Sequence, residues 1–292
     1  MSPGTLVRGR FVLDPAPPAP GGRAQTAVIA EGAVYQVGGT IVAVGPFADL
    51  RATHPDAEVV GSGSDVVLPG FVNGHHHVGL TPFQLGSPDL PLELWVISRL
   101  GARTVDPYLD TLCSAFELIA SGVTTVQHIQ SRLVGPQEAW LPRVDAMLAA
   151  YRDVGMRVSF SFNLRDQSRL IYGDDDAFAA SLPEPPRCGA QTLLAEQGMP
   201  LAQQLDCFFF DLRRRWDSDR TRVQLAPSNY HWLSDTALEE IASLSETTGV
   251  PMHMHVLETP YQRVYGRRRA GGSVVARLAE LGLVGPRLTA GH

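Results

Sequence analysis

The pattern of apolar and polar positions changes near residue 68. Before that point, short runs rich in valine and aromatic residues, such as LVRGRFVLD and AVYQVGGTIVAVG, are broken by glycine and proline. Such runs are typical of β-strands, and Gly38-Gly39 between two of them predicts a hairpin turn. Residues 1–67 are therefore expected to form a small β-sandwich portion. So few strands are rarely stable alone, so this portion should pack on something else.

From Leu68 onward, segments with helical spacing alternate with short apolar runs. The helices are expected to begin at capping residues or to end at glycines. A less regular insertion from Asp166 to Arg220 is expected to carry a helix near Leu201–Trp216. The other expected helices are Asp106–Ser121 with Leu109, Leu112, Phe116 and Ile119 at helical spacing, Trp140–Val154 with Val144, Leu148 and Tyr151 on one face, a helix between Ser234 and Gly249, and Ser273–Leu281.

The apolar runs between these helices predict six strands. Strands that alternate with helices imply a parallel sheet, either open and doubly wound or closed into a (β/α) barrel. Because a natural domain rarely ends on an uncovered core strand, the chain is expected to be incomplete at its C-terminal end. The predicted strands are Val66–Asn73, Thr124–Ile129, Arg157–Asn163, Arg222–Pro227, Pro251–Val256 and Leu288–His292.

Composition narrows the class of protein. The 292 residues carry a formal charge of −6, which argues against a nucleic-acid or anionic-membrane partner. The N-terminus lacks an apolar signal core, so the cytoplasm is the expected location. The cysteines Cys113, Cys188 and Cys207 form no C-x-x-C pair. All 24 basic residues are arginine, which removes lysine-based chemistry such as a Schiff base.

Histidines follow three of the predicted strands. In LPGFVNGHHHV, His75 and His77 point to one face of a strand and His76 to the other. A single H-x-H pair is more often a polar strand end than a ligand pair. The later strands, however, supply the pair in HMHVLE, with Glu258 three residues after His255, and the terminal His292. Imidazole is a preferred zinc ligand, so the recurrence predicts a metal site at the carboxyl ends of the strands.

These motifs resemble those of the amidohydrolase superfamily. LPGFVNGHHH is similar to its P-G-F-x-N-x-H-x-H signature, and GVPMHMHVLET resembles the H-x-x-E strand of its cytosine-deaminase and chlorohydrolase-like branch. Weaker similarity runs through GVTTV, SDTALEEI and GPRLTAGH, so the resemblance covers essentially the whole chain. The resemblance implies an α/β fold, a distorted (β/α)8 barrel of which residues 68–292 hold about six strands. It also implies a small β-sandwich built from both chain ends.

The resemblance also implies roles for particular residues. His75, His77 and His255 would bind one divalent metal ion, with zinc favoured over iron. Glu258 would carry a proton to the substrate's ring nitrogen or leaving amine, and His292 would hydrogen-bond the attacking water or the developing oxyanion. The other two histidines of these strands, His76 and His253, are expected to be packed structural residues.

Two features separate this chain from parts of the family. Binuclear relatives bridge two metals with a carboxylated lysine, and the absence of lysine therefore favours a single-metal site. The family's last ligand is an aspartate at the end of the eighth strand, and it would lie beyond His292. The acidic run Asp174–Asp176 is expected to be solvated rather than to replace that ligand.

The expected activity is hydrolysis of carbon–nitrogen bonds other than peptide bonds, namely deamination of an amino-heterocycle or amidine-like small molecule by a metal-activated water. Ring opening of a cyclic amide, dechlorination, a catalytically silent truncated fragment and a metal-free binding module are the alternatives. A nitrogen-containing small molecule is the expected partner, and family members often form homodimers. Candidate substrate contacts are Gln84, Asn229 and His231.

Overall fold

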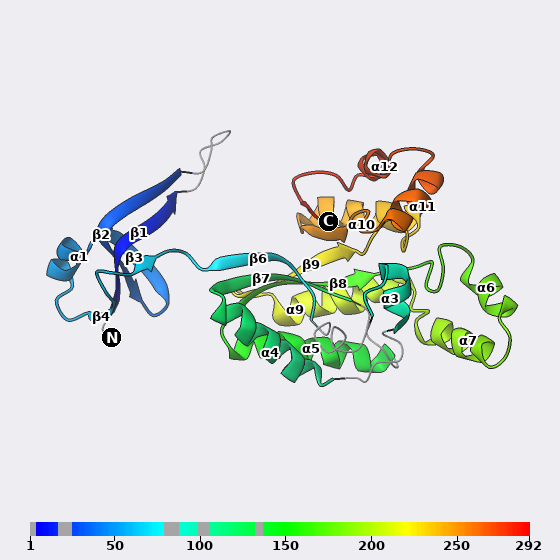
Figure 1. Ribbon diagram of the computed structural model, residues 1–292, viewed down its shortest axis with the longest axis horizontal. Coiled ribbons are helices and arrows are strands. Elements are labelled where there is room, and N and C mark those ends of the chain that lie inside the picture. The colour runs from blue at the N-terminus through cyan, green and yellow to red at the C-terminus, as the bar shows by residue number, and fades with distance from the viewer. Residues whose placement is uncertain (1–3, 17–24, 79–87, 99–104, 132–136) are drawn as a thin grey trace. The chain divides into compact units, whose positions relative to one another are not determined.

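The structure is a computed structural model that describes residues 4–16, 25–78, 88–98, 105–131 and 137–292 (Figure 1). It divides into two compact units, Met1–Gly70 and Phe71–His292. Each unit has its own sheet and its own cluster of buried apolar side chains.

The first unit is a small mixed sheet with strand order β3-β2-β1-β4, and β5 pairs with β1. Gly38 and Gly39, with φ values of 57° and 84°, form the predicted turn between β2 and β3. Leu6, Ala33 and Ala57 form its small core. Its elements are β1 (Thr5–Ala16), β2 (Gln25–Val37), β3 (Thr40–Pro46), α1 (Phe47–Thr53), β4 (Glu58–Gly61) and β5 (Val66–Val67).

The second unit is built on six parallel strands in the order β11-β10-β9-β8-β7-β6, which confirms the predicted parallel sheet and its six strands. A Cβ added to Gly291 at the end of β11 would lie 2.9 Å from the His75 ring of β6, so the two outermost strands approach each other and the barrel is nearly closed. The strands are β6 (Phe71–His76), β7 (Val123–Gln130), β8 (Arg157–Leu164), β9 (Thr221–Pro227), β10 (Met252–His255) and β11 (Leu288–Gly291).

Helices cover the outside of these strands: α4 packs on β7, α5 on β8 and α10 on β9 (Figure 1). Asp106 and Ser234 cap α4 and α10 with their side chains, as the sequence predicts, and Ser273 caps α12 in the same way. The helices are α3 (Leu92–Ser98), α4 (Pro107–Ala120), η2 (Gln137–Ala139), α5 (Trp140–Asp153), α6 (Asp175–Ser181), α7 (Pro186–Glu196), α8 (Leu201–Leu205), η3 (Asp206–Asp211), α9 (Leu212–Trp216), α10 (Asp235–Thr248), α11 (Pro260–Ala270) and α12 (Val274–Glu280).

Alternate strand positions divide the barrel into an apolar outer layer and a polar interior. Phe160 and Met254 point outward into the main core, where they join Leu148 and Ile241 from the helices. Inside the barrel, Gln127 Nε2 of β7 donates to Gln224 Oε1 of β9 at 3.0 Å. The strand-end histidines extend this polar interior toward the carboxyl end of the barrel.

The structure corrects two sequence-based expectations. The predicted strand Val66–Asn73 is in fact two strands, because β5 pairs with β1 of the first unit and β6 begins the barrel at Phe71. On α4, Leu109, Phe116 and Ile119 are exposed, whereas small and polar side chains of that helix face the barrel. The periodicity therefore identifies the helix but not its buried face.

Among the described residues, no helix combines the length and the apolar character that a bilayer crossing requires.

Candidate metal centre

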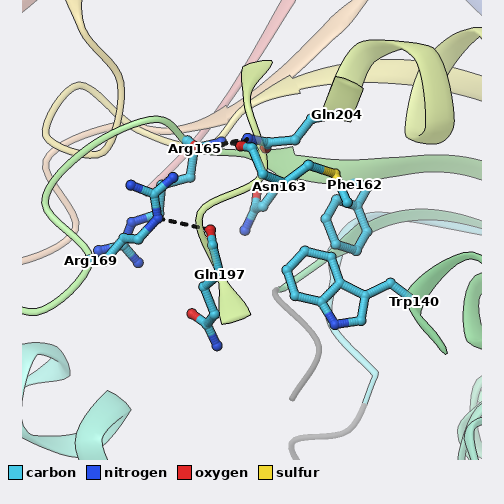
Figure 2. Close-up of a pocket in the computed structure, with 8 residues that line it drawn as sticks. Trp140, Phe162, Asn163, Arg165, Arg169, Gln197 and Gln204 are labelled. Carbon is cyan, nitrogen blue, oxygen red and sulfur yellow. Dashed lines mark hydrogen bonds between the residues drawn. The ribbon is translucent and has the colours of Figure 1, made fainter. Parts of the chain in front are cut away.

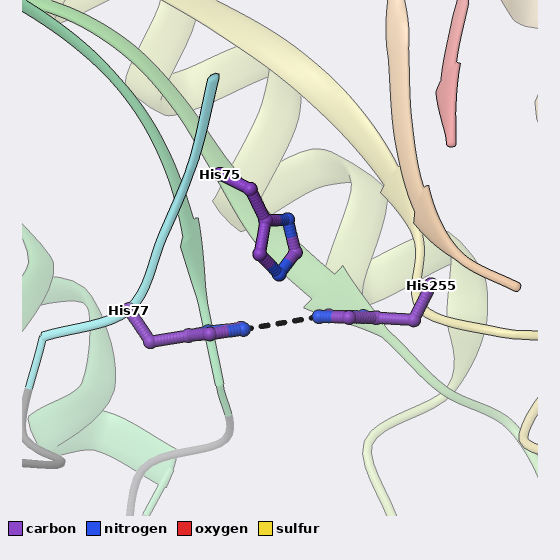
Figure 3. A group of neighbouring side chains, drawn as sticks. All are labelled: His75, His77 and His255. Atoms are coloured by element: carbon purple, nitrogen blue, oxygen red, sulfur yellow. Dashed lines mark hydrogen bonds between the residues drawn. The ribbon is translucent and has the colours of Figure 1, made fainter. Parts of the chain in front are cut away.

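The three predicted ligands meet at the carboxyl end of the barrel. His75 lies near the end of β6, His77 directly follows that strand, and His255 ends β10. One ring nitrogen from each lies within 4.8 Å of the others, and Figure 3 shows the three rings turned toward one another. His76 points the other way, and its Nε2 lies 2.7 Å from Ser114 Oγ on α4. The period-two alternation of side chains thus separates neighbouring histidines as the sequence predicts.

Backbone carbonyls fix the tautomers of two of these rings. His77 Nδ1 lies 2.7 Å from the Ile129 carbonyl oxygen, and His255 Nδ1 lies 3.1 Å from that of Ser228. Because a carbonyl can only accept, each Nδ1 carries the proton and each Nε2 presents a lone pair. These two Nε2 atoms face each other at 3.0 Å (Figure 3).

Two lone pairs at that distance repel each other unless a cation lies beside them. Two nitrogens bound to one tetrahedral zinc at 2.0–2.1 Å are separated by about 3.3 Å, close to the observed spacing. The third ring agrees, since His75 Nε2 is buried and has no hydrogen-bond partner. The donor set of three imidazoles therefore fits a divalent metal ion.

His253 forms a hydrogen bond with the His75 ring from a position deeper in the barrel. Its Nε2 lies 2.8 Å from His75 Nδ1, and the residue is fully buried. The sequence predicts a packed barrel histidine here, and the structure adds a hydrogen bond to a candidate ligand. Metal-binding histidines usually bond through their second nitrogen to a polar group that fixes their orientation.

The environment keeps the rings neutral. Burial, with a smaller contribution from neighbouring histidines, lowers the pKa of His77 to about 2 and that of His255 to about 4. Burial also lowers the pKa of His75, and His292 adds to that shift. Neutral imidazole is the form that binds a metal, so the lone pairs are available throughout the neutral pH range.

The two predicted catalytic residues lie beside this cluster. Glu258 Oε1 is 3.9 Å from His292 Nε2, and the His292 ring is stacked on that of His255 with centroids 5.5 Å apart. Burial raises the pKa of the Glu258 carboxyl above its ordinary value; His292 and the Gln262 side chain oppose that shift, and the Glu93 charge adds to it. A carboxyl whose pKa is raised in this way is better suited to exchanging a proton with a substrate than a fully solvated one.

The predicted substrate contacts lie in different surroundings. Asn229 is fully buried, and its Oδ1 accepts hydrogen bonds from the backbone N–H groups of His231 and Trp232, an arrangement that stabilises the turn after β9. His231 is also fully buried, and burial lowers its pKa to about 4. Gln84 lies outside the described residues.

A pocket lies at the end of β8, separate from the histidines. Figure 2 shows Arg165, Arg169 and Gln197 on one side of it and Trp140 and Phe162 on the other. Arg169 Nε donates to the Gln197 carbonyl at 2.9 Å. None of the candidate metal ligands lines this pocket. The pocket is therefore not assigned to the metal centre.

Sequence reasoning does not identify several residues around Glu258. Thr259, which ends the GVPMHMHVLET segment, donates a hydrogen bond to Glu93 of α3, and Gln262 accepts one from the Glu258 N–H. Neither Glu93 nor Gln262 lies in a recognisable motif. Only the folded chain brings Glu93 next to a residue 165 positions away.

Comparison with known proteins agrees with this geometry. A model described as "Amidohydrolase family" matches residues 66–292. The chain belongs to the amidohydrolase family. A model of an imidazolonepropionase-like composite domain from bacteria matches residues 32–57, within the first unit.

Similar family members include several deaminases. The 5'-deoxyadenosine deaminase of Methanothermobacter thermautotrophicus is 27% identical over 249 residues, 83% of this chain and 49% of that protein. The 5-methylthioadenosine/S-adenosylhomocysteine deaminase 1 of Syntrophus aciditrophicus is 27% identical over 271 residues, 90% of this chain and 53% of that protein. The chain thus spans about half the length of the curated relatives it matches.

Solved structures show the same amidohydrolase fold. An adenosine deaminase from Xanthomonas campestris with bound zinc has a TM-score of 0.63 and 24% identity, covering 98% of this chain and 56% of that one. Zinc-complexed atrazine chlorohydrolase from Arthrobacter aurescens has a TM-score of 0.74 and 17% identity, covering 99% and 60%. The predicted amidohydrolase-type barrel is therefore confirmed.

Proposed function

We propose that this amidohydrolase hydrolyses carbon–nitrogen bonds other than peptide bonds, and that it deaminates an amino-heterocycle or amidine-like small molecule. The observation that carries the proposal is the group of three neutral imidazoles with a partly buried carboxyl beside it at the carboxyl end of the barrel. The similar proteins named as adenosine-type deaminases support it and make 6-aminopurine nucleosides the first substrates to test.

In this proposal His75, His77 and His255 hold one divalent metal ion. Zinc is favoured over iron because the ligand atoms are imidazole nitrogens and because two structural neighbours contain zinc. Such an ion lowers the pKa of water and polarises the carbon under attack. The absence of lysine in the chain favours a single ion over a lysine-bridged pair.

The chain's own residues move the proton and stabilise charge. Glu258 takes a proton from the attacking water and returns it to the ring nitrogen or the leaving amine. His292, 3.9 Å from Glu258 Oε1, donates a hydrogen bond to the oxygen that becomes negatively charged. The proposed location is the cytoplasm, and a homodimer stays a prediction that light scattering would test.

The direct test is ammonia release by zinc-reconstituted protein. Adenosine, 5'-deoxyadenosine, 5'-methylthioadenosine and S-adenosylhomocysteine would be assayed with and without prior chelation. We expect zinc-dependent ammonia release from at least one of them. Chloride release from chlorotriazines, or ring opening of cyclic amides without ammonia, would instead support the alternative hydrolases. No turnover by a zinc-loaded, folded chain would contradict the proposal and favour a catalytically silent fragment.

A further inference from the structure

The Glu93 carboxylate joins three segments at the carboxyl end of the barrel. Its Oε1 atom accepts a hydrogen bond from the Tyr172 hydroxyl at 2.9 Å and another from Thr259 Oγ1 at 2.6 Å. Glu93 lies on α3, Tyr172 lies between β8 and α6, and Thr259 caps α11. A carboxylate that accepts two hydroxyl groups is a strong local anchor, because bonds to a charged acceptor are stronger than neutral ones.

Aromatic rings shield this anchor from solvent. The Tyr172 ring is stacked on Tyr265 of α11 with centroids 4.9 Å apart, and it meets His231 edge-on at 5.1 Å. Glu93 Oε2 is buried as well. Hydrogen bonds in such a protected place are screened less than those at the surface, so their loss is felt more strongly.

The turn held by Thr259 presents Glu258 to the histidines. Immediately before it, Leu257 has a φ of 58°, a conformation that a branched side chain rarely adopts. Two side chains oppose relaxation of this turn: Gln262 Oε1 accepts from the Glu258 N–H at 2.9 Å, and Thr259 Oγ1 accepts from the Gln262 N–H at 3.1 Å. Strained residues persist where surrounding contacts over-determine them.

We propose that Glu93 is a positioning residue that, through Thr259, holds the strained turn at Leu257 and thereby aims Glu258 at His292. The expected effect of Glu93 on turnover rests on the proposed function. The turn geometry itself can be measured without turnover. No motif marks Glu93, and its role follows from the Glu93–Thr259–Gln262–Glu258 contacts alone.

The charge of Glu93 also affects the pKa of Glu258, which provides a second way to test the proposal. The groups that act on the Glu258 carboxyl are His292, Glu93 and the Gln262 side chain. Glu93 raises the pKa of Glu258, because two negative carboxylates close together disfavour each other's ionisation. Replacing Glu93 by glutamine should therefore lower the pKa of Glu258, an effect that a purely structural contact would not produce.

The first experiment is amide hydrogen exchange of residues 256–262 in wild-type, Glu93→Ala and Glu239→Ala protein. Glu239 is an exposed glutamate of α10 and serves as the matched control. We expect exchange at the Glu258 and Gln262 amides to accelerate about tenfold or more in Glu93→Ala, while α10 and the Glu239→Ala protein remain as in wild type. Unchanged exchange at these two amides would overturn the inference, whatever the protein's activity.

A second set of variants guards against misfolding of Glu93→Ala. Thr259→Ser keeps the hydroxyl and should behave as wild type, whereas Thr259→Val keeps the shape and should accelerate exchange. In zinc-loaded protein that turns over, Glu93→Gln and Thr259→Val should lower kcat about 10- to 100-fold with little change in KM, and their effects should not add. Additive effects, or an equal loss in Thr259→Ser, would contradict the positioning role.

The pKa of Glu258 provides the last readout. Titration of protein labelled with ¹³C at the glutamate carboxyls, with Glu258→Gln used for assignment, should show a lower Glu258 pKa in Glu93→Gln than in wild type. An unchanged Glu258 pKa would contradict the proposed effect of the Glu93 charge on Glu258. The expected changes in hydrogen exchange and in the Glu258 pKa could also be found in a folded protein that deaminates none of the substrates. That result would contradict the proposed function and would leave the positioning role of Glu93 supported.

Discussion

At the scale of single residues, the candidate site depends on which nitrogen of each imidazole carries its proton. Ile129 of β7 and Ser228, which directly follows β9, supply the carbonyls that fix His77 and His255. The H-x-H and H-x-x-E spacings predict which rings converge. They cannot predict these backbone partners, or the contact between Glu93 and Thr259, because sheet register and tertiary packing decide them.

Glu258→Gln separates metal binding from proton transfer. Glutamine has nearly the same shape but cannot exchange a proton, so we expect the variant to retain its metal and lose about 10²- to 10⁴-fold in kcat. Elemental analysis and ammonia release on the same sample would check this. Full activity in the variant would show that another group moves the proton.

At the scale of elements, strand alternation is the most predictive feature of the sequence and helix amphipathicity the less reliable one. Five of the six barrel strands and the caps Asp106 and Ser234 follow the predicted pattern closely, whereas the first barrel strand begins at Phe71 rather than at Val66. The helix α11, PYQRVYGRRRA, was not expected because its side chains are mostly polar. It begins at the side-chain cap Thr259 followed by a proline. These two signals alone do not predict so polar a helix, because its stability depends on tertiary contacts.

Gly291→Ala tests the approach of β11 to β6. A Cβ there would lie 2.9 Å from His75 Cε1, and the ring cannot retreat freely because its Nδ1 contacts His253. We expect zinc affinity to fall about tenfold or more, as when a ligand's supporting contacts are disturbed. Gly285→Ala is the matched control, since a Cβ there meets nothing within 4 Å. Calorimetric titration with zinc would compare them, and equal affinities in both variants would show that the ring has room.

At the scale of the whole molecule, the nearly closed barrel carries neutral, buried histidines on both faces of its sheet. Burial lowers the pKa of His128 to about 3 and that of His253 to about 3, beside the candidate ligands already described. The His128 side chain points to the outer face of the barrel, where its Nδ1 lies 3.2 Å from the Tyr151 hydroxyl oxygen. The metal site is thus one part of a larger buried imidazole network that the motif alone does not predict.

This network predicts how stability depends on pH. Below about pH 6.5 the unfolded chain binds protons on these histidines while the folded chain does not, so the free energy of unfolding must fall as the pH falls toward 4. Each such ring contributes about 1.4 kcal/mol per pH unit at most. All four tryptophans lie in the second unit, so urea unfolding of chelated protein followed by tryptophan fluorescence reports that unit. A constant unfolding free energy between pH 7 and pH 5 would contradict the prediction.

The central claim is that His75, His77 and His255 hold a metal ion. Elemental analysis of the 292-residue protein, purified without chelator, tests it most directly when His77→Ala and His76→Ala are measured alongside. We expect about one zinc or iron per chain in wild type. The metal should be lost in His77→Ala and retained in His76→Ala, whose ring faces Ser114 instead. A folded wild-type chain without metal, or equal metal loss in both variants, would contradict the account.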